Sequence, residues 1–192
     1  MNSMNPMAPG ASVTELVEDV ATQAGYSLWL LPEIAWATRL DALVMQLAPS
    51  FGCPVFQAHM TVQGDLGVSQ GALEAVLDSA RCMPLEFELA GVETSEAYFR
   101  SFYLRLRDNP DFRTLQTQVS THTGTAVGLS PFPHVSLAYG EPADPAGKSR
   151  WREALASAGL PMTLRFDRLA LVRSSRQVPI GQWVVLRTQR LG

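Results

Sequence analysis

Two short segments of the chain share a pattern in which a histidine is followed, two positions later, by a small hydroxyl residue. The first is His59-Met60-Thr61-Val62 and the second is His134-Val135-Ser136-Leu137. The chain has only three histidines, so the repetition involves two of the three. Side chains at positions i and i+2 of a β-strand point to the same face. Two such strands side by side would present two imidazoles and two hydroxyls to one cleft.

This set of groups is suited to acid/base chemistry at phosphorus. Imidazole has an ordinary pKa near 6.5, so at neutral pH one ring can be neutral while another is protonated. A neutral histidine can take a proton from water, and a protonated one can give a proton to a leaving oxygen. Thr61 and Ser136 could donate hydrogen bonds to the non-bridging oxygens. A strained cyclic phosphodiester is a suitable substrate, because ring strain lowers the barrier.

Two other chemistries compete with this interpretation. Zinc could be bound by His59 and His134 with His122 or Asp65 as a third ligand, but no His-x-x-x-His spacing is present. His122 lies in a polar segment and is expected to be a solvated residue near a helix C-terminus. A serine hydrolase is disfavoured because the chain has no G-x-S-x-G motif. We therefore predict a site without a metal.

Composition restricts the partners. The chain has 192 residues, is 46% hydrophobic and carries a formal net charge of -3, which suits one compact globule and provides no basic track for extended nucleic acid. No apolar stretch approaches the roughly 20 residues that span a bilayer, and residues 1–10 do not resemble a secretory signal. We expect a cytoplasmic monomer that does not bind membranes, with reduced thiols at Cys53 and Cys82.

Hydrophobic periodicity predicts an α+β protein. An N-terminal tail and extra helix (Val13–Ala24) occupy residues 1–24, and residues 25–192 form a single domain. Strands are expected at Tyr26–Leu31, Val55–Gln63, Leu85–Val92, Tyr98–Arg107, Pro133–Tyr139, Pro161–Val172 and Gln182–Thr188, and helices at 32–48, 69–81, 111–121 and 144–158. The two histidine strands fall at comparable points of the two halves. This order predicts two similar lobes with antiparallel sheets facing a central cleft and helices outside.

The paired tetrapeptides resemble the 2H phosphoesterase superfamily and, within it, the cyclic phosphodiesterases of plants and yeast. The resemblance runs from Tyr26 to about Thr188. It also includes Tyr26-Ser27-Leu28-Trp29, Leu31-Pro32, Tyr139-Gly140, Arg168-Leu169-Ala170-Leu171 and Trp183. It implies a bilobal, metal-independent enzyme without a cofactor. Its substrates would be 2′,3′-cyclic nucleotides, opened to 2′-phosphates, or ADP-ribose 1″,2″-cyclic phosphate.

The resemblance also implies roles for single residues. His59 and His134 would be the catalytic pair, with His134 as the base toward water and His59 as the acid. Thr61 and Ser136 would bind the phosphate. Tyr139 would lie near the phosphate and Trp29 would line the cleft. Strict alternation places Tyr139 on the face opposite Ser136, so its role requires a twist or turn before Gly140.

Two alternatives remain open at this point. An enzyme of the same fold could process RNA ends, as an RNA ligase or 2′,5′-phosphodiesterase does, although the acidic balance of the chain weighs against a long RNA. A non-catalytic nucleotide-binding module is disfavoured by the presence of both histidines.

Overall fold

The structure, a computed structural model, describes residues 25–80 and 82–192. The predicted N-terminal helix lies outside these residues. The elements are β1 (Tyr26–Pro32), α2 (Ile34–Phe51), β2 (Met60–Leu66), α3 (Gln70–Ser79), β3 (Leu85–Thr94), η1 (Tyr98–Arg100), β4 (Phe102–Leu106), α4 (Pro110–Thr123), β5 (His134–Ala138), α5 (Gly147–Ser157), β6 (Thr163–Arg173), η2 (Ile180–Gln182) and β7 (Val184–Arg190). No helix in the described part of the chain is long and apolar enough to cross a membrane.

The strands form one antiparallel sheet in the order β2-β1-β6-β3-β4-β5, with β7 added beside β6. Strand β6 joins its two halves. Its first residues, 163–166, pair with β3, whereas residues 168–173 pair with β7 and with β1 on the other edge. The first half therefore contains β2, β1 and β7, and the second contains β3, β4 and β5. The predicted α+β class with antiparallel strands and outer helices is confirmed.

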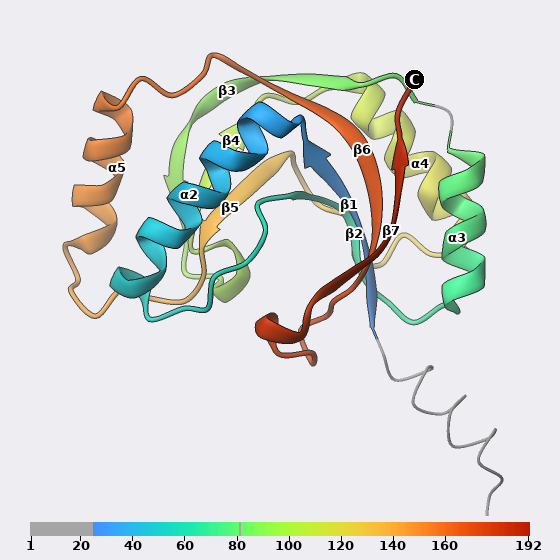
Figure 1. Ribbon diagram of the computed structural model, residues 1–192, viewed down its shortest axis with the longest axis horizontal. Coiled ribbons are helices and arrows are strands. Elements are labelled where there is room, and N and C mark those ends of the chain that lie inside the picture. Colours follow the sequence, from blue (N-terminus) through green and yellow to red (C-terminus); the bar gives the residue numbers. More distant parts are fainter. Residues whose placement is uncertain (1–24, 81) are drawn as a thin grey trace, which may run out of the picture.

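The helices lie in two pairs on opposite sides of the molecule, α2 with α5 and α3 with α4 (Figure 1). Helix α2 packs against β5 and β1, whereas α4 packs against β2. The helix that follows β1 thus covers the second histidine strand, and the helix that precedes β5 covers the first. The two halves are interleaved, so neither histidine strand is supported only by its own half of the sequence.

The helix boundaries follow local signals. Ser69 caps α3 as predicted, because its hydroxyl accepts a hydrogen bond from the Ala72 N–H at 3.4 Å. Helix α2 was expected to stop at Ala48, but it runs to Phe51. Pro49 is accommodated in its last turn, and the chain leaves the helix at Gly52, whose φ of 58° lies in the left-handed region.

The strand predicted at Val55–Gln63 begins only at Met60, so residues 53–59 belong to no ladder. Strand β1 ends at Pro32, which has no N–H to pair with a longer β2. The Ala58 N–H instead donates to the Asp41 carboxylate of α2 at 2.7 Å. The predicted alternation nevertheless holds, since Phe56, Ala58, Met60 and Val62 are all buried in the core.

Candidate active site

A cavity of about 610 Å³ opens between β2 and β5. The six residues singled out from the sequence all line it: Trp29, His59, Thr61, His134, Ser136 and Tyr139. The cavity volume lies in the range that holds a small-molecule ligand. The structure therefore brings together groups that lie up to 110 residues apart in the sequence.

His59 is held between a carbonyl and an indole. It immediately precedes β2, and its Nδ1 lies 2.7 Å from the carbonyl oxygen of Gln57. Its ring stacks on Trp29, with centroids 3.5 Å apart and planes inclined by 8°. Trp29 reaches this position because it is the cross-strand partner of Thr61 in the β1–β2 ladder. The His59 side chain is 7% exposed, so its ring is fixed at the cavity wall.

His134 is held by the same kind of contact with a backbone carbonyl. It is the first residue of β5, and its Nδ1 lies 3.0 Å from the carbonyl oxygen of Phe132, again two residues earlier. Since a carbonyl can only accept, Nδ1 carries the hydrogen in both rings, and Nε2 is left to exchange a proton with a ligand. The two histidines therefore present the same tautomer to the cavity.

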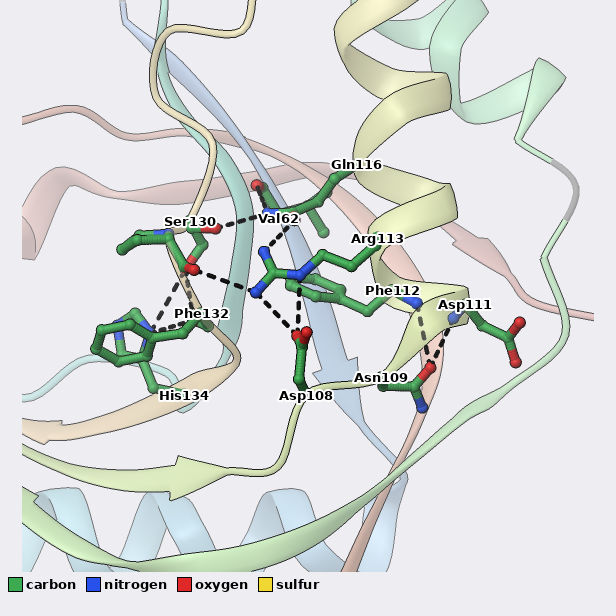
Figure 2. A network of polar contacts seen from close by, with 11 residues as sticks. Val62, Asp108, Asn109, Asp111, Phe112, Arg113, Gln116, Ser130, Phe132 and His134 are labelled. Atoms are coloured by element: carbon green, nitrogen blue, oxygen red, sulfur yellow. Dashed lines mark hydrogen bonds and ion pairs between the residues drawn. The ribbon is translucent and has the colours of Figure 1, made fainter.

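A buried amide ties the segment before His134 to the first histidine strand (Figure 2). The Gln116 side chain of α4 donates from Nε2 to the carbonyl oxygens of Val62 at 3.3 Å and Ser130 at 2.8 Å. The Ser130 N–H donates to the same Val62 carbonyl at 3.1 Å. Because Val62 lies on β2, Gln116 positions the two histidine segments relative to each other.

The same network reaches the carbonyl that orients His134 (Figure 2). The Ser130 hydroxyl donates to the Phe132 carbonyl oxygen at 2.9 Å. Arg113 supports the loop from the other side, donating to the Pro131 carbonyl at 3.2 Å and to the Asp108 carboxylate at 2.9 Å. The imidazole of His134 thus rests on a hydrogen-bonded loop, which α4 holds in place.

Burial makes both imidazoles weak bases. It lowers the pKa of His59 to about 4, and the charge of His134 adds to this effect. Burial also lowers the pKa of His134 to about 4, and there the charges of Arg100 and Arg105 contribute. Both rings are therefore neutral at pH 7 in the free protein.

The two hydroxyls differ in their surroundings. Thr61 is half-buried on the cavity wall. Ser136 donates its hydrogen to the carbonyl oxygen of Phe99 at 3.1 Å. Donation from Ser136 to a substrate oxygen would therefore require rotation of its side chain, whereas its lone pairs remain able to accept.

Tyr139 reaches the cavity because of a β-bulge. In the β4–β5 ladder Tyr103 pairs with Ser136 and Phe102 with Ala138, so Leu137 is an extra residue. A bulge interrupts alternation and re-aims the side chains that follow it. The Tyr139 ring stacks on Phe56 with centroids 4.0 Å apart, and burial raises the pKa of its hydroxyl, which interacts with Ser136.

Sequence reasoning gave no role in the site to the groups that two loops bring to the cavity, although Trp183 is among the residues that carry the resemblance. Tyr98, Phe99 and Arg100 come from η1, where a continuous strand was expected over 98–107. Trp183 follows η2, and its indole N–H donates to the Val178 carbonyl at 3.0 Å. Adjacent aromatic and basic residues at Tyr98–Arg100 were a signal, but a strand interpretation could not show which of them face the cavity.

The proposed third zinc ligands lie in unsuitable places. His122 is exposed on α4 and its Nδ1 bonds to the Gln118 carbonyl at 2.8 Å. Asp65 lines the cavity, but its carboxylate is bonded to the side chain and the backbone N–H of Arg176, at 2.7 and 2.9 Å. Within residues 25–80 and 82–192, no three His, Cys, Asp or Glu side chains are grouped as metal ligands.

Comparisons with known proteins agree with this geometry. No curated protein matches the sequence. Among solved structures, E. coli LigT complexed with phosphate aligns with a TM-score of 0.56 and 15% identity over 88% of this chain and 97% of its own. The TT0787 protein of Thermus thermophilus aligns with a TM-score of 0.57 and 17% identity over 87% and 97%. A model of the 2′-5′ RNA ligase superfamily matches residues 32–177, and the chain therefore belongs to this superfamily of 2H phosphoesterases.

Proposed function

We propose that the protein hydrolyses small cyclic phosphodiesters, namely 2′,3′-cyclic nucleotides or ADP-ribose 1″,2″-cyclic phosphate, to phosphomonoesters. The observation that carries this proposal is the matched pair of imidazoles in one cavity, each with Nδ1 bonded to the carbonyl two residues earlier. Two Nε2 atoms in one cavity can supply one base and one acid.

The surroundings of the two rings favour different roles. Arg100 and Arg105 disfavour a positive charge on His134. His59 instead stacks on the face of Trp29, where a protonated ring gains cation–π attraction. When an anionic phosphodiester enters, its charge raises the pKa of both rings. The indole stacked on His59 favours a positive charge there, whereas the two arginines disfavour one on His134. His134 is accordingly the base and His59 the acid.

The reaction then balances with one water molecule. His134 Nε2 accepts a proton from water as the water oxygen forms a bond to phosphorus. The P–O bond on the opposite side of phosphorus breaks, and His59 gives its Nε2 proton to the leaving ribose oxygen. The product is a phosphomonoester with one free hydroxyl. After product release His134 gives its proton to solvent, and His59 takes up a proton again when the next phosphodiester raises its pKa.

Several features support a small substrate. The cavity volume of about 610 Å³ suits a mononucleotide, and aromatic rings from Tyr98, Phe99 and Trp183 offer apolar surface for a base. E. coli LigT, which has the same fold, has been crystallised with phosphate and with 3′-AMP.

The superfamily name supports a second candidate, an enzyme that acts on RNA ends. Turnover of a panel of 2′,3′-cyclic nucleotides, ADP-ribose cyclic phosphate and short oligonucleotides ending in a cyclic phosphate separates the two candidates. Phosphorus NMR of the products, with EDTA present, identifies the ester bond that is cut. Preference for oligonucleotides over mononucleotides would favour the second candidate, and loss of turnover in EDTA that zinc restores would contradict the metal-independent mechanism.

A further inference from the structure

Arg100 is an unpaired cation at the cavity wall. It is the last residue of η1, and its guanidinium carbon lies 4.7 Å from the centre of the Phe132 ring. Its Nε is buried and has no hydrogen-bond partner. Within the described residues, no carboxylate forms an ion pair with it. A guanidinium that lines a cavity without a counter-charge points to an anionic ligand at this wall.

Arg105 provides a natural comparison within the same molecule. It lies on β4 directly opposite His134, and its guanidinium carbon lies 3.6 Å from the centre of the same Phe132 ring. It does not line the cavity. Both arginines therefore place a positive charge near His134, but only Arg100 can touch a molecule bound in the cavity.

The other arginine of the cavity wall is already neutralised. Arg176 is largely exposed, and its Nε lies 2.7 Å from the Asp65 carboxylate. Asp65 holds this position with a φ of 53°, a left-handed conformation uncommon for a residue other than glycine. Two arginines of the described residues line the cavity, and of these Arg100 is the one without a counter-charge.

We propose that Arg100 binds the non-bridging oxygens of the substrate phosphate beside His134. This assignment rests on the proposed function, because it names the group that holds the phosphate during that reaction. Guanidinium donors match phosphate oxygens in geometry and charge. Arg100 also compensates for Ser136, whose hydrogen is directed to the Phe99 carbonyl and not into the cavity.

The test compares Arg100→Gln with Arg105→Gln. Both variants remove one charge from the same aromatic ring, and only the first removes a donor from the cavity. Hydrogen bonds to a charged group contribute about 1.5–3 kcal/mol, so Arg100→Gln should lower kcat/KM for a 2′,3′-cyclic nucleotide about 10- to 150-fold. Arg105→Gln should lower kcat/KM less than Arg100→Gln does, since it removes a charge near His134 but no contact with the substrate.

A second readout does not depend on catalysis. The dissociation constant of inorganic phosphate, measured by calorimetry, should rise at least about tenfold in Arg100→Gln, and Arg100→Lys should recover part of the loss because it retains the charge. Thermal melts of all three variants show whether the fold is kept. If Arg100→Gln fails to fold, the phosphate affinity of Arg100→Lys relative to that of Arg105→Lys takes its place.

Three results would overturn the assignment. Equal losses of phosphate affinity in Arg100→Gln and Arg105→Gln would show that the charges act only through their field. Unchanged phosphate affinity and turnover in Arg100→Gln would show that Arg100 does not bind the ligand, while the proposed function would stand. A wild-type protein that opens no cyclic phosphate would refute the proposed function, and unchanged phosphate affinity in Arg100→Gln of that protein would refute this assignment as well.

Discussion

Acidification should destabilise this protein through its two cavity histidines. The pKa of each is lowered from 6.5 to about 4 in the folded state because the ring is buried. Between these two pH values the unfolded chain binds a proton at each histidine and the folded protein does not. The free energy of unfolding is therefore highest above pH 6.5 and decreases as the pH falls toward 4.

The size of the effect follows from the two pKa values. For a group that titrates at 6.5 unfolded and about 4 folded, lowering the pH from 7 to 5 reduces the free energy of unfolding by about 2 kcal/mol. Two such histidines together account for about 4 kcal/mol. This is a large part of the roughly 5–15 kcal/mol that stabilises an ordinary domain.

Urea unfolding at pH 7 and pH 5 measures this difference directly. His59→Gln and His134→Gln should each lose about 2 kcal/mol less than the wild type between the two pH values, because each variant removes one titrating ring. His122→Gln is the matched control, since His122 is exposed on α4 and does not line the cavity. A His59→Gln variant with the same pH dependence as His122→Gln would refute the burial of a neutral imidazole at this site.

The remaining predictions concern activity and the network around it. His59→Ala and His134→Ala should each lower kcat more than about 100-fold in a cyclic nucleotide assay, and near-native turnover in either would refute the acid/base pair. Thr61→Ala and Ser136→Ala should cost less than the histidine changes, and an equally inactive Ser136→Ala would indicate a nucleophilic serine. In the wild type, kcat/KM should fall about tenfold per pH unit above about pH 5, because one ring of the free enzyme must be protonated. The decrease in kcat should begin at a higher pH, because the bound phosphate raises the pKa of both rings. Gln116→Met should lower the free energy of unfolding by about 1–3 kcal/mol and reduce kcat; reduced stability with unchanged kcat would limit Gln116 to a structural role.

The sequence predicted the parts of the site that depend on local periodicity. Apolar alternation around His59 and the hydroxyl two positions after each histidine are properties of an extended chain, and the structure retains them. The Tyr139 side chain depends on a bulge at Leu137, which arises from the pairing of β5 with β4 and leaves no pattern in the sequence of β5.

Long-range geometry limited the rest of the prediction. Periodicity predicted four helices in the described part of the chain, and all four are present. It could not show that α2 covers β5 and α4 covers β2, because packing between distant segments decides which helix covers which strand. The orphan Nε of Arg100 likewise depends on where η1 interrupts the expected strand, which is a tertiary property.

Charge links the fold to the size of its substrate. The chain has a formal net charge of -3, which repels a polyanion such as a long RNA. Within the described cavity wall, however, one guanidinium is uncompensated and a second is neutralised by Asp65. A local positive charge in a protein of negative net charge attracts a single phosphate. It offers no row of basic residues to the neighbouring phosphates of an RNA chain. This distribution favours a small cyclic phosphate over an extended RNA, and it predicts that added salt weakens substrate binding only modestly.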